Sequence, residues 1–315
     1  MALKTKLCDL LEIETPIIQG GMAWVATGEL AAAVSSAGGL GIIGAGNAPA
    51  DVIEKEIEKV RKLTDKPFGL NIMLLSPFAD DIIELAIEKK VPVITTGAGN
   101  PGKHVKRFQE AGSKVIPVIP SVAMAKRMER LDVDAVIVEG TEAGGHIGEL
   151  TTMALVPQVV DSVDIPVIAA GGVADGRGLA AVLSLGAAGA QIGTRFVCSE
   201  ECTASEEFKM AIIGARDRDA VVTGRSTGHP VRNLKNKLTK EIDKLEKEGA
   251  DPKEVEELGS GKLRDAVIDG DVQGGSVMAG QVSGMISEIK SVKDIIEDIE
   301  LEAENTIRKS YDLLE

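Results

Sequence analysis

The sequence predicts an α/β fold, a (β/α)8 TIM barrel with a smaller inserted cap domain. Three features indicate it: eight short apolar runs, helical stretches between them, and a charged segment after the eighth run. A chain of 315 residues, 44% of them hydrophobic, is long enough for one barrel of this type. An open, doubly wound sheet is the alternative fold.

The eight apolar runs predict strands that are buried on both faces. Six of the eight runs end in glycine or proline, and none alternates polar with apolar side chains. This pattern is typical of a parallel sheet. The runs occupy residues 16–21, 40–46, 68–74, 91–99, 114–120, 135–140, 165–172 and 190–196.

The stretches between the runs predict helices. In residues 51–64 the apolar side chains fall on one face, opposite glutamate and lysine. Residues 28–39 contain Gly38 where a helix would end, and glycine suits the C′ position. Residues 176–187 predict another apolar helix before the eighth run.

A cap is predicted over residues 201–275, between barrel parts at 1–200 and 276–315. The cap segment is polar and rich in charge, and it includes a solvated helix at 238–249. The amphipathic segment 291–314 is expected to supply the last helix of the barrel wall.

Composition excludes several classes of function. The net charge is −14, from 49 acidic and 35 basic residues, and aromatic residues make up 2% of the chain. These values argue against nucleic-acid binding. The three cysteines, Cys8, Cys198 and Cys202, cannot form a disulfide framework, and their spacing gives no metal site. With no secretory or membrane-spanning run, we expect a cytoplasmic protein without membrane insertion.

One glycine-rich stretch resembles a nucleotide motif without its chemistry. Residues 95–104, TTGAGNPGKH, contain G-x-G-x-x-G and nearly a Walker A loop. A P-loop requires serine or threonine where His104 stands, and the next strand ends without the acid that would bind a ribose. We interpret the stretch as an ordinary loop at the top of the barrel.

The loops after the seventh and eighth runs favour a phosphate site. Barrels commonly bind phosphate in these two loops, where backbone N–H groups converge. Gly171, Gly172 and Gly193 would let the backbone approach a phosphate, and Thr194 adds a hydroxyl donor. The alternative is tight packing of glycine in turns.

A histidine and an asparagine are candidate site residues. In EGTEAGGHIGELTT (139–152), four glycines flank His146, which follows the sixth run on the face where barrel active sites gather. Imidazole suits proton transfer near neutral pH, so a catalytic or ligand-contacting role is predicted. His104 and His229 are assigned to the surface. Asn71 is a polar amide in an apolar run, which indicates either a satisfied core side chain or a contact to a bound polar ring.

Taken in order along nearly the whole chain, eight stretches closely resemble the FMN-dependent enoyl-ACP reductases of the FabK type, in the nitronate monooxygenase superfamily. The resemblance weakens between residues 200 and 263. The stretches are PIIQGGMAWVA, GLGIIGAGNAP, DKPFGLNIMLLSPF, ITTGAGNP, EAGGHIGELTTM, IPVIAAGGVADG, QIGTRF and DGDVQGGSVMAGQ.

The resemblance implies site residues by their place in these motifs. His146 matches the family's active-site histidine, and Asn47 and Met278 would approach the substrate side of the flavin. Nitronate monooxygenases tend to carry glutamine in place of Glu139, which favours the reductase. The implied flavin contacts are Gly21, Met22, Asn71, Glu139 and Gly144, with Gly172, Gln191, Gly193 and Thr194 at the phosphate end.

The implied reaction is reduction of a trans-2-enoyl chain on acyl carrier protein, in bacterial fatty-acid synthesis. NADH or NADPH would reduce FMN, which would deliver hydride to the β-carbon. His146 would lie near the thioester, either donating the proton at the α-carbon or orienting the acyl group. A homodimer is implied, and so is a monovalent cation whose ligands are unknown.

Two other functions remain open: a nitronate-oxidising flavoprotein that uses oxygen, and a flavin-binding protein without turnover. Because acyl carrier protein is acidic, the reductase needs a basic docking surface. Residues 224–240 are one candidate, and a solvated helix face is the alternative. The basic residues of this segment are Arg225, Arg232, Lys235, Lys237 and Lys240.

Overall fold

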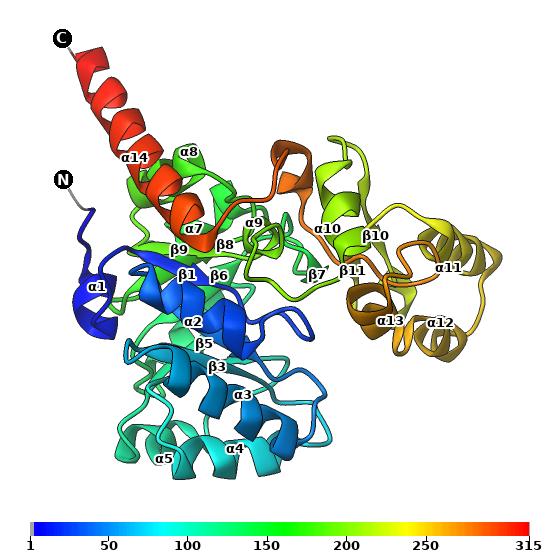
Figure 1. Cartoon of the computed structure of the whole chain (residues 1–315), viewed down its shortest axis with the longest axis horizontal. Helices are drawn as coiled ribbons and strands as arrows, with labels where there is room; N and C mark the ends of the chain where they lie inside the picture. Colours follow the sequence, from blue (N-terminus) through cyan, green and yellow to red (C-terminus); the bar gives the residue numbers. More distant parts are fainter. Residues whose placement is uncertain (1–2, 315) are drawn as a thin grey trace.

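Eight parallel strands form a closed barrel in the computed structural model, which describes residues 3–314 (Figure 1). A bridge between Ile18 and Leu40 joins the two ends of the sheet, so the barrel prediction is confirmed and the open-sheet alternative is wrong. Each predicted run overlaps one strand. The strands, in spatial order, are β1 (Ile17–Gln19), β9 (Gly189–Ile192), β8 (Val167–Ala170), β6 (Val136–Glu139), β5 (Lys114–Ile119), β4 (Val93–Gly97), β3 (Phe68–Met73) and β2 (Gly41–Gly44).

Closure of the barrel between β1 and β2 depends on a buried glutamine. Gln19 is 0% exposed, and its side chain pairs with the backbone of Ile42. Gln19 Oε1 accepts from the Ile42 N–H at 3.1 Å, and Gln19 Nε2 donates to the Ile42 carbonyl at 3.2 Å. The side-chain amide therefore extends the ladder where the short strand β1 ends.

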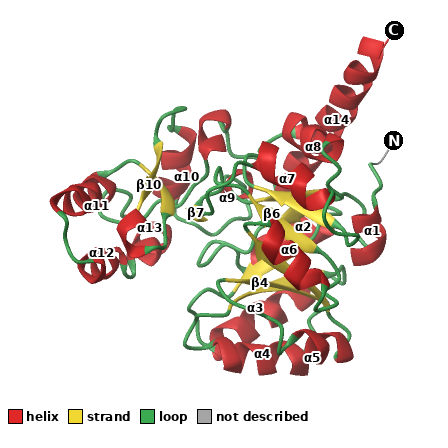
Figure 2. Cartoon of the chain, turned by 180° about the vertical axis from the view of Figure 1, so that it is seen from behind, coloured by secondary structure: helices red, strands yellow, loops and turns green. Residues whose placement is uncertain are grey.

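Helices surround the barrel, and Figure 2 shows them outside the strands. Every helix predicted from the pattern is present, and Gly38 lies at C′ of its helix with φ of 95°. A further helix, α1 (Lys6–Leu11), packs its apolar residues on side chains from the barrel interior, including Ile18 and Ile42. The wall is made of α2 (Gly28–Ser36), α3 (Ala50–Leu63), α4 (Ala79–Glu88), α5 (Val105–Glu110), α6 (Val122–Glu129), α7 (Thr152–Val160), α8 (Gly176–Ser184) and α14 (Val292–Tyr311).

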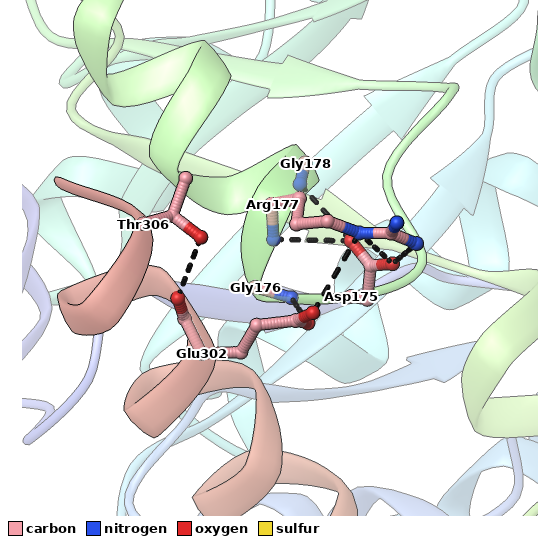
Figure 3. Close-up of polar contacts among 6 residues, drawn as sticks. All are labelled: Asp175, Gly176, Arg177, Gly178, Glu302 and Thr306. Atoms are coloured by element: carbon pink, nitrogen blue, oxygen red, sulfur yellow. Dashed lines mark hydrogen bonds and ion pairs between the residues drawn. The ribbon is translucent and has the colours of Figure 1, made fainter. Parts of the chain in front are cut away.

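The last wall helix, α14, is fixed to the start of α8 (Figure 3). Glu302 of α14 accepts a hydrogen bond from the Gly176 N–H at 2.9 Å. Asp175 accepts from the Arg177 and Gly178 N–H groups at 3.0 and 3.1 Å. The carboxylates of Glu302 and Asp175 thus accept hydrogen bonds from the first N–H groups of α8, so these groups are not free to bind a phosphate. A phosphate would have to bind N–H groups of the loops that precede α8.

Most of the remaining elements lie beside the barrel, whereas the short helix α9 directly follows barrel strand β9 (Figure 1). They include a three-stranded antiparallel sheet in the order β10-β11-β7, whose third strand belongs to the barrel loop after β6. This loop lies outside residues 201–275 but pairs with the added segment in one sheet, so the structure shows no sharp border between barrel and cap. The cap boundaries at residues 201 and 275 stay a prediction. The elements are β7 (Gly145–His146), α9 (Thr194–Val197), α10 (Glu206–Ile213), β10 (Ala220–Thr223), β11 (Val231–Leu234), α11 (Lys237–Glu248), α12 (Pro252–Gly259) and α13 (Lys262–Asp269).

Two general features bear on function. Within residues 3–314, no helix is long and apolar enough to cross a membrane. The three cysteines are free and buried, and burial raises the pKa of the Cys198 thiol to about 12. A thiol held in this protonated form is a poor nucleophile and a poor metal ligand.

Candidate active site

The residues that sequence reasoning assigned to the site lie at the carboxyl ends of the barrel strands and in one returning segment. This is the face on which barrel enzymes build their active sites. From the first half of the barrel, Gly21 and Met22 follow β1, Asn47 follows β2, and Asn71 lies in β3. From the second half, Glu139 ends β6, Gly144 and His146 lie in the loop after it, Gly171 and Gly172 follow β8, Gln191 lies in β9, and Gly193 and Thr194 follow β9. Met278 belongs to the returning segment, between α13 and α14.

Asn71 is held against the loop after β1. Its Oδ1 accepts a hydrogen bond from Thr95 Oγ1 at 2.9 Å, and its Nδ2 lies 3.5 Å from the Gly21 carbonyl. A Cβ atom at Gly21 would lie 2.8 Å from Cγ of Asn71, so only glycine permits this approach. Thr95 was missed by sequence reasoning, although it is polar within a buried strand. Its hydroxyl fixes the amide and leaves a weakly bound Nδ2 for a ligand.

Glu139 and Gln191 bring further polar groups to the strand ends. Gln191 is 9% exposed, and its side chain lies beside the position that a Cβ would take at Gly20, 3.6 Å away. Among residues 3–314, neither the carboxyl group of Glu139 nor the amide of Gln191 has a hydrogen-bond partner. Glu139 is half-buried and Gln191 is nearly buried, so both side chains are still open to hydrogen bonds from a polar ligand.

Desolvation raises the pKa of the Glu139 carboxyl group from 4.5 to about 7. The folded protein therefore keeps a proton that the unfolded chain releases between these two values, and stability falls as pH rises through this window. We expect Glu139→Gln, a neutral mimic, to remove this fall and to stabilise the ligand-free protein above pH 7 by up to about 3 kcal/mol. Urea unfolding at about pH 5 and about pH 8 measures it. An unchanged pH dependence in the variant would contradict the assignment.

The loops after β6, β8 and β9 converge at the predicted phosphate end. Gly171 and Gly172 have φ of 87° and 78°, which favour glycine. A Cβ at Gly171 would lie 2.9 Å from the Gly140 carbonyl, so tight packing explains this residue. Gly172 is exposed, and a Cβ there would lie 3.6 Å from the Glu142 side chain. Thr194 Oγ1 accepts from the Gly280 N–H at 3.0 Å and can still donate its own proton.

His146 lies in β7 with an exposed side chain. Val231 of β11 is its register partner, and the Ile147 N–H donates to the Pro230 carbonyl at 3.2 Å. Partial desolvation, and then the neighbouring His229, lower the pKa of His146. The ring is therefore neutral at pH 7, with one N–H donor and one acceptor nitrogen.

The segment around Met278 packs against the same loop. A Cβ at Gly144 would lie 2.6 Å from the carbonyl carbon of Ala279, and one at Gly145 would lie 3.6 Å from Sδ of Met278. Met278 is thus brought close to the His146 loop. Asn47 is exposed in the loop after β2, and within the described chain its side chain makes no hydrogen bond to these residues.

Met22 lies between the loops after β1 and β9. A Cβ at Gly193 would lie 3.5 Å from Sδ of Met22, and the Met22 carbonyl accepts from the Ala26 N–H at 2.8 Å. The thioether therefore fills the space over Gly193. This brings together two of the predicted cofactor residues that lie 171 residues apart in the chain.

The surface assignment of His104 is wrong, whereas His229 is exposed as predicted. His104 is 7% exposed at the N-cap of α5, and its ring lies 6.3 Å from that of Phe108. Its Nδ1 has no hydrogen-bond partner within residues 3–314, and burial is the main cause that lowers its pKa. The loop after β4 folds His104 beneath α5, which the local sequence does not reveal.

The basic segment is smaller than its sequence suggests. Arg232 is 6% exposed, and Arg225 forms an ion pair with Glu149 at 3.0 Å. Strand β11 places Arg232 inward, since alternate residues of a strand point to opposite faces. Three exposed lysines remain, and none forms an ion pair within residues 3–314: Lys235, Lys237 and Lys240.

A cavity of about 550 Å³ lies apart from this site, between α8, α14 and the segment that precedes α14. Its charged groups are largely paired with one another, as Arg177 is with Asp175 and Lys290 with Asp298. Glu139 and Gln191, whose side chains have no partner within the described chain, lie at the strand ends, so we place the candidate active site there and not in this cavity.

The closed barrel, with free polar groups gathered at its carboxyl mouth, defines a (β/α)8-barrel enzyme. A family model described as nitronate monooxygenase matches residues 4–302, and the chain belongs to this family. FabK from Thermotoga maritima is 53% identical with a TM-score of 0.97, over 99% of this chain and 100% of that one.

Two curated relatives are more distant. A probable nitronate monooxygenase of Staphylococcus saprophyticus is 35% identical over 98% of this chain and 100% of its own. A Mycobacterium tuberculosis protein is 34% identical over the whole of both chains. It is named (3aS,4S,5R,7aS)-5-hydroxy-7a-methyl-1-oxo-octahydro-1H-indene-4-carboxyl-CoA dehydrogenase. The family therefore contains different oxidoreductases.

Proposed function

We propose that this protein is an FMN- and NAD(P)H-dependent enoyl-ACP reductase of bacterial fatty-acid synthesis. The observation that carries the proposal is the similarity to FabK from Thermotoga maritima, at 53% identity over 99% of the chain. The probable nitronate monooxygenase of Staphylococcus saprophyticus reaches 35%. The FabK likeness is the more specific of the two.

The residues at the barrel mouth fit FMN. The weakly bound Nδ2 group of Asn71 and the unpartnered side chains of Glu139 and Gln191 offer the hydrogen bonds that a polar ring requires. Gly172, Gly193 and Thr194 lie where barrels receive phosphate. Bound FMN would accept hydride from NADH or NADPH and transfer hydride to the enoyl β-carbon, while the protein supplies position and electrostatics.

His146 is the residue to which we assign the acyl end of the reaction. A neutral imidazole can donate a hydrogen bond to the thioester oxygen, where negative charge develops during reduction, or a proton to the α-carbon. Glu139, with a pKa of about 7, is a second group at the mouth that can hold a proton at neutral pH.

One set of assays tests the proposal against its rivals. Denaturation of the purified protein should release FMN, and NADH should be consumed in proportion to added crotonyl-CoA. Oxygen uptake with a nitronate and without NADH would instead identify a nitronate monooxygenase. Bound flavin with neither activity would identify a flavin-binding protein, and protein that refuses FMN would end the proposal.

We further propose that acyl carrier protein delivers the substrate in the cytoplasm, to a homodimer. The proposed reductase also uses a monovalent cation, with no ligand assigned. The docking surface would be formed by Lys235, Lys237 and Lys240, which lie around β11 and the start of α11. These three lysines form no ion pair within the described chain and make a locally basic surface on a protein whose net charge is −14. An acidic partner would recognise such a surface.

Reversing two of these charges should weaken docking alone. We expect Lys235→Glu with Lys237→Glu to raise KM for an enoyl-ACP by about fivefold, because attraction becomes repulsion at the edge of the interface. Turnover of crotonyl-CoA should stay unchanged. Steady-state kinetics with both substrates measures this difference.

The matched control reverses two exposed lysines of the barrel wall, Lys62 and Lys106, which make the same change in net charge. This control should leave both substrates unaffected. Equal losses on enoyl-ACP and crotonyl-CoA, or equal losses in the control, would reject the docking surface.

A further inference from the structure

Arg232 is a buried cation that forms no ion pair, although the Glu142 carboxylate lies near enough to favour its charged form. It is 6% exposed, and within residues 3–314 no carboxylate lies within ion-pair distance of its guanidinium. Burial lowers its pKa, which reflects the cost of removing the charge from water. A protein tolerates such a group when hydrogen bonds compensate for the lost hydration.

The compensating hydrogen bonds of Arg232 lead to the His146 loop. Arg232 Nε and Nη2 both donate to the Thr141 carbonyl, at 3.1 and 2.9 Å. Arg232 Nη1 donates to the Ala220 carbonyl of β10 at 3.3 Å. One side chain thus joins the sheet beside the barrel to the first turn after β6.

The backbone of β11 makes a second connection to this loop. Strands β7 and β11 lie side by side (Figure 1), with Arg232 the register partner of Gly145 and Val231 that of His146. Only two residues of β7 pair, a short ladder for a loop that contains several glycines. The backbone pairing alone is therefore a weak restraint, and the Thr141 contact fixes the loop at a second point.

The same strand also holds the segment of Met278. The Leu234 N–H donates to the Val277 carbonyl at 2.8 Å, and Asn233 Oδ1 accepts from Ser276 Oγ at 2.6 Å. Asn233 also forms an isolated bridge with Met278. Consecutive residues of β11 therefore set the distance between the His146 loop and the Met278 segment.

We propose that Arg232 is a positioning residue, which holds the His146 loop on β11 in the geometry that enoyl reduction requires. The expected effect on enoyl reduction rests on the proposed function. The restraint on the loop does not depend on that function. Arg232 acts through the His146 loop, whereas most of the predicted cofactor contacts are built on β3 and β9 and the turns that follow β1, β8 and β9.

Hydrogen exchange measures the restraint directly. In Arg232→Met, the amides of residues 145–147 should exchange about tenfold faster than in the unchanged protein. In Arg225→Met, which removes an exposed contact between the same two segments, exchange should stay within about twofold. Unchanged exchange in Arg232→Met would overturn the proposal. Arg232→Lys, which keeps the charge but loses the fork, repeats the comparison if the methionine variant does not fold.

A double-mutant cycle measures the catalytic consequence. Arg232→Met should lower the rate of enoyl reduction about tenfold or more, with bound FMN and the rate of flavin reduction by NADH unchanged. Combined with His146→Ala, it should cause no further loss. Additive losses would show that Arg232 acts independently of His146 and overturn the positioning role. Full activity of His146→Ala alone would instead refute the function assigned to His146, and the exchange result would still decide the loop restraint.

Discussion

Replacing His146 by alanine should lower the rate of enoyl thioester reduction by a factor of about 10² to 10⁴, the usual contribution of a positioned proton donor. His146 is the exposed residue of β7, and its neighbour Gly145 faces the Met278 segment. Because its side chain has no hydrogen-bond partner within residues 3–314, its loss should leave the fold and the flavin content unchanged. Rapid-mixing measurements of flavin reduction by NADH and reoxidation by crotonyl-CoA separate the two steps, and only the second should slow.

His229→Ala is the matched control for this experiment. His229 is also exposed, and it lies close enough to influence the pKa of His146, but the proposed chemistry assigns it no role. Its removal should leave the rate nearly unchanged and let the pKa of His146 rise. Full reoxidation by crotonyl-CoA in His146→Ala would remove the assigned role.

Replacing Gly21 by alanine should weaken FMN binding by about ten- to hundredfold. The added methyl group would lie 2.8 Å from Cγ of Asn71 and still closer to its Cβ, so Asn71 must move or the loop after β1 must retreat. Such overpacking costs about 1–3 kcal/mol, which corresponds to that loss of affinity when it falls on the binding site. Titration of the cofactor-free protein with FMN, followed by flavin fluorescence, measures it.

Gly97→Ala provides the comparison at the same mouth. Gly97 ends β4, has no positive φ, and no atom lies within 4 Å of the position of an added Cβ. This variant should bind FMN like the unchanged protein. Equal affinity in the Gly21 and Gly97 variants would show that the approach of Gly21 to Asn71 does not support the cofactor site.

The barrel could be predicted because its signals are local. Buried parallel strands require continuous apolar runs, and wall helices require an apolar stripe, so the sequence reveals both at each position along the chain. The barrel topology then brings every strand end to one face, which is why candidates from distant motifs, such as Asn71 and Gln191, could be assigned to one site.

Other residues were misjudged or missed because their surroundings come from distant segments. Arg232 was grouped with exposed lysines, but it is buried against a carbonyl 91 residues away. His104 lies beneath α5, where its ring packs near Phe108. Gln19 pairs with the backbone of β2, and the only available signal was a glutamine inside an apolar run.

The amino-acid sequence alone determined the number, type and order of the barrel elements and the loops that carry the candidate site, since periodicity and glycine placement report local backbone requirements. Only the tertiary structure decided which side chains are buried and which polar groups lack partners. It also decided that β11 joins the His146 loop to the Met278 segment. These properties depend on which distant segments meet, and a pattern read along one chain does not contain that information.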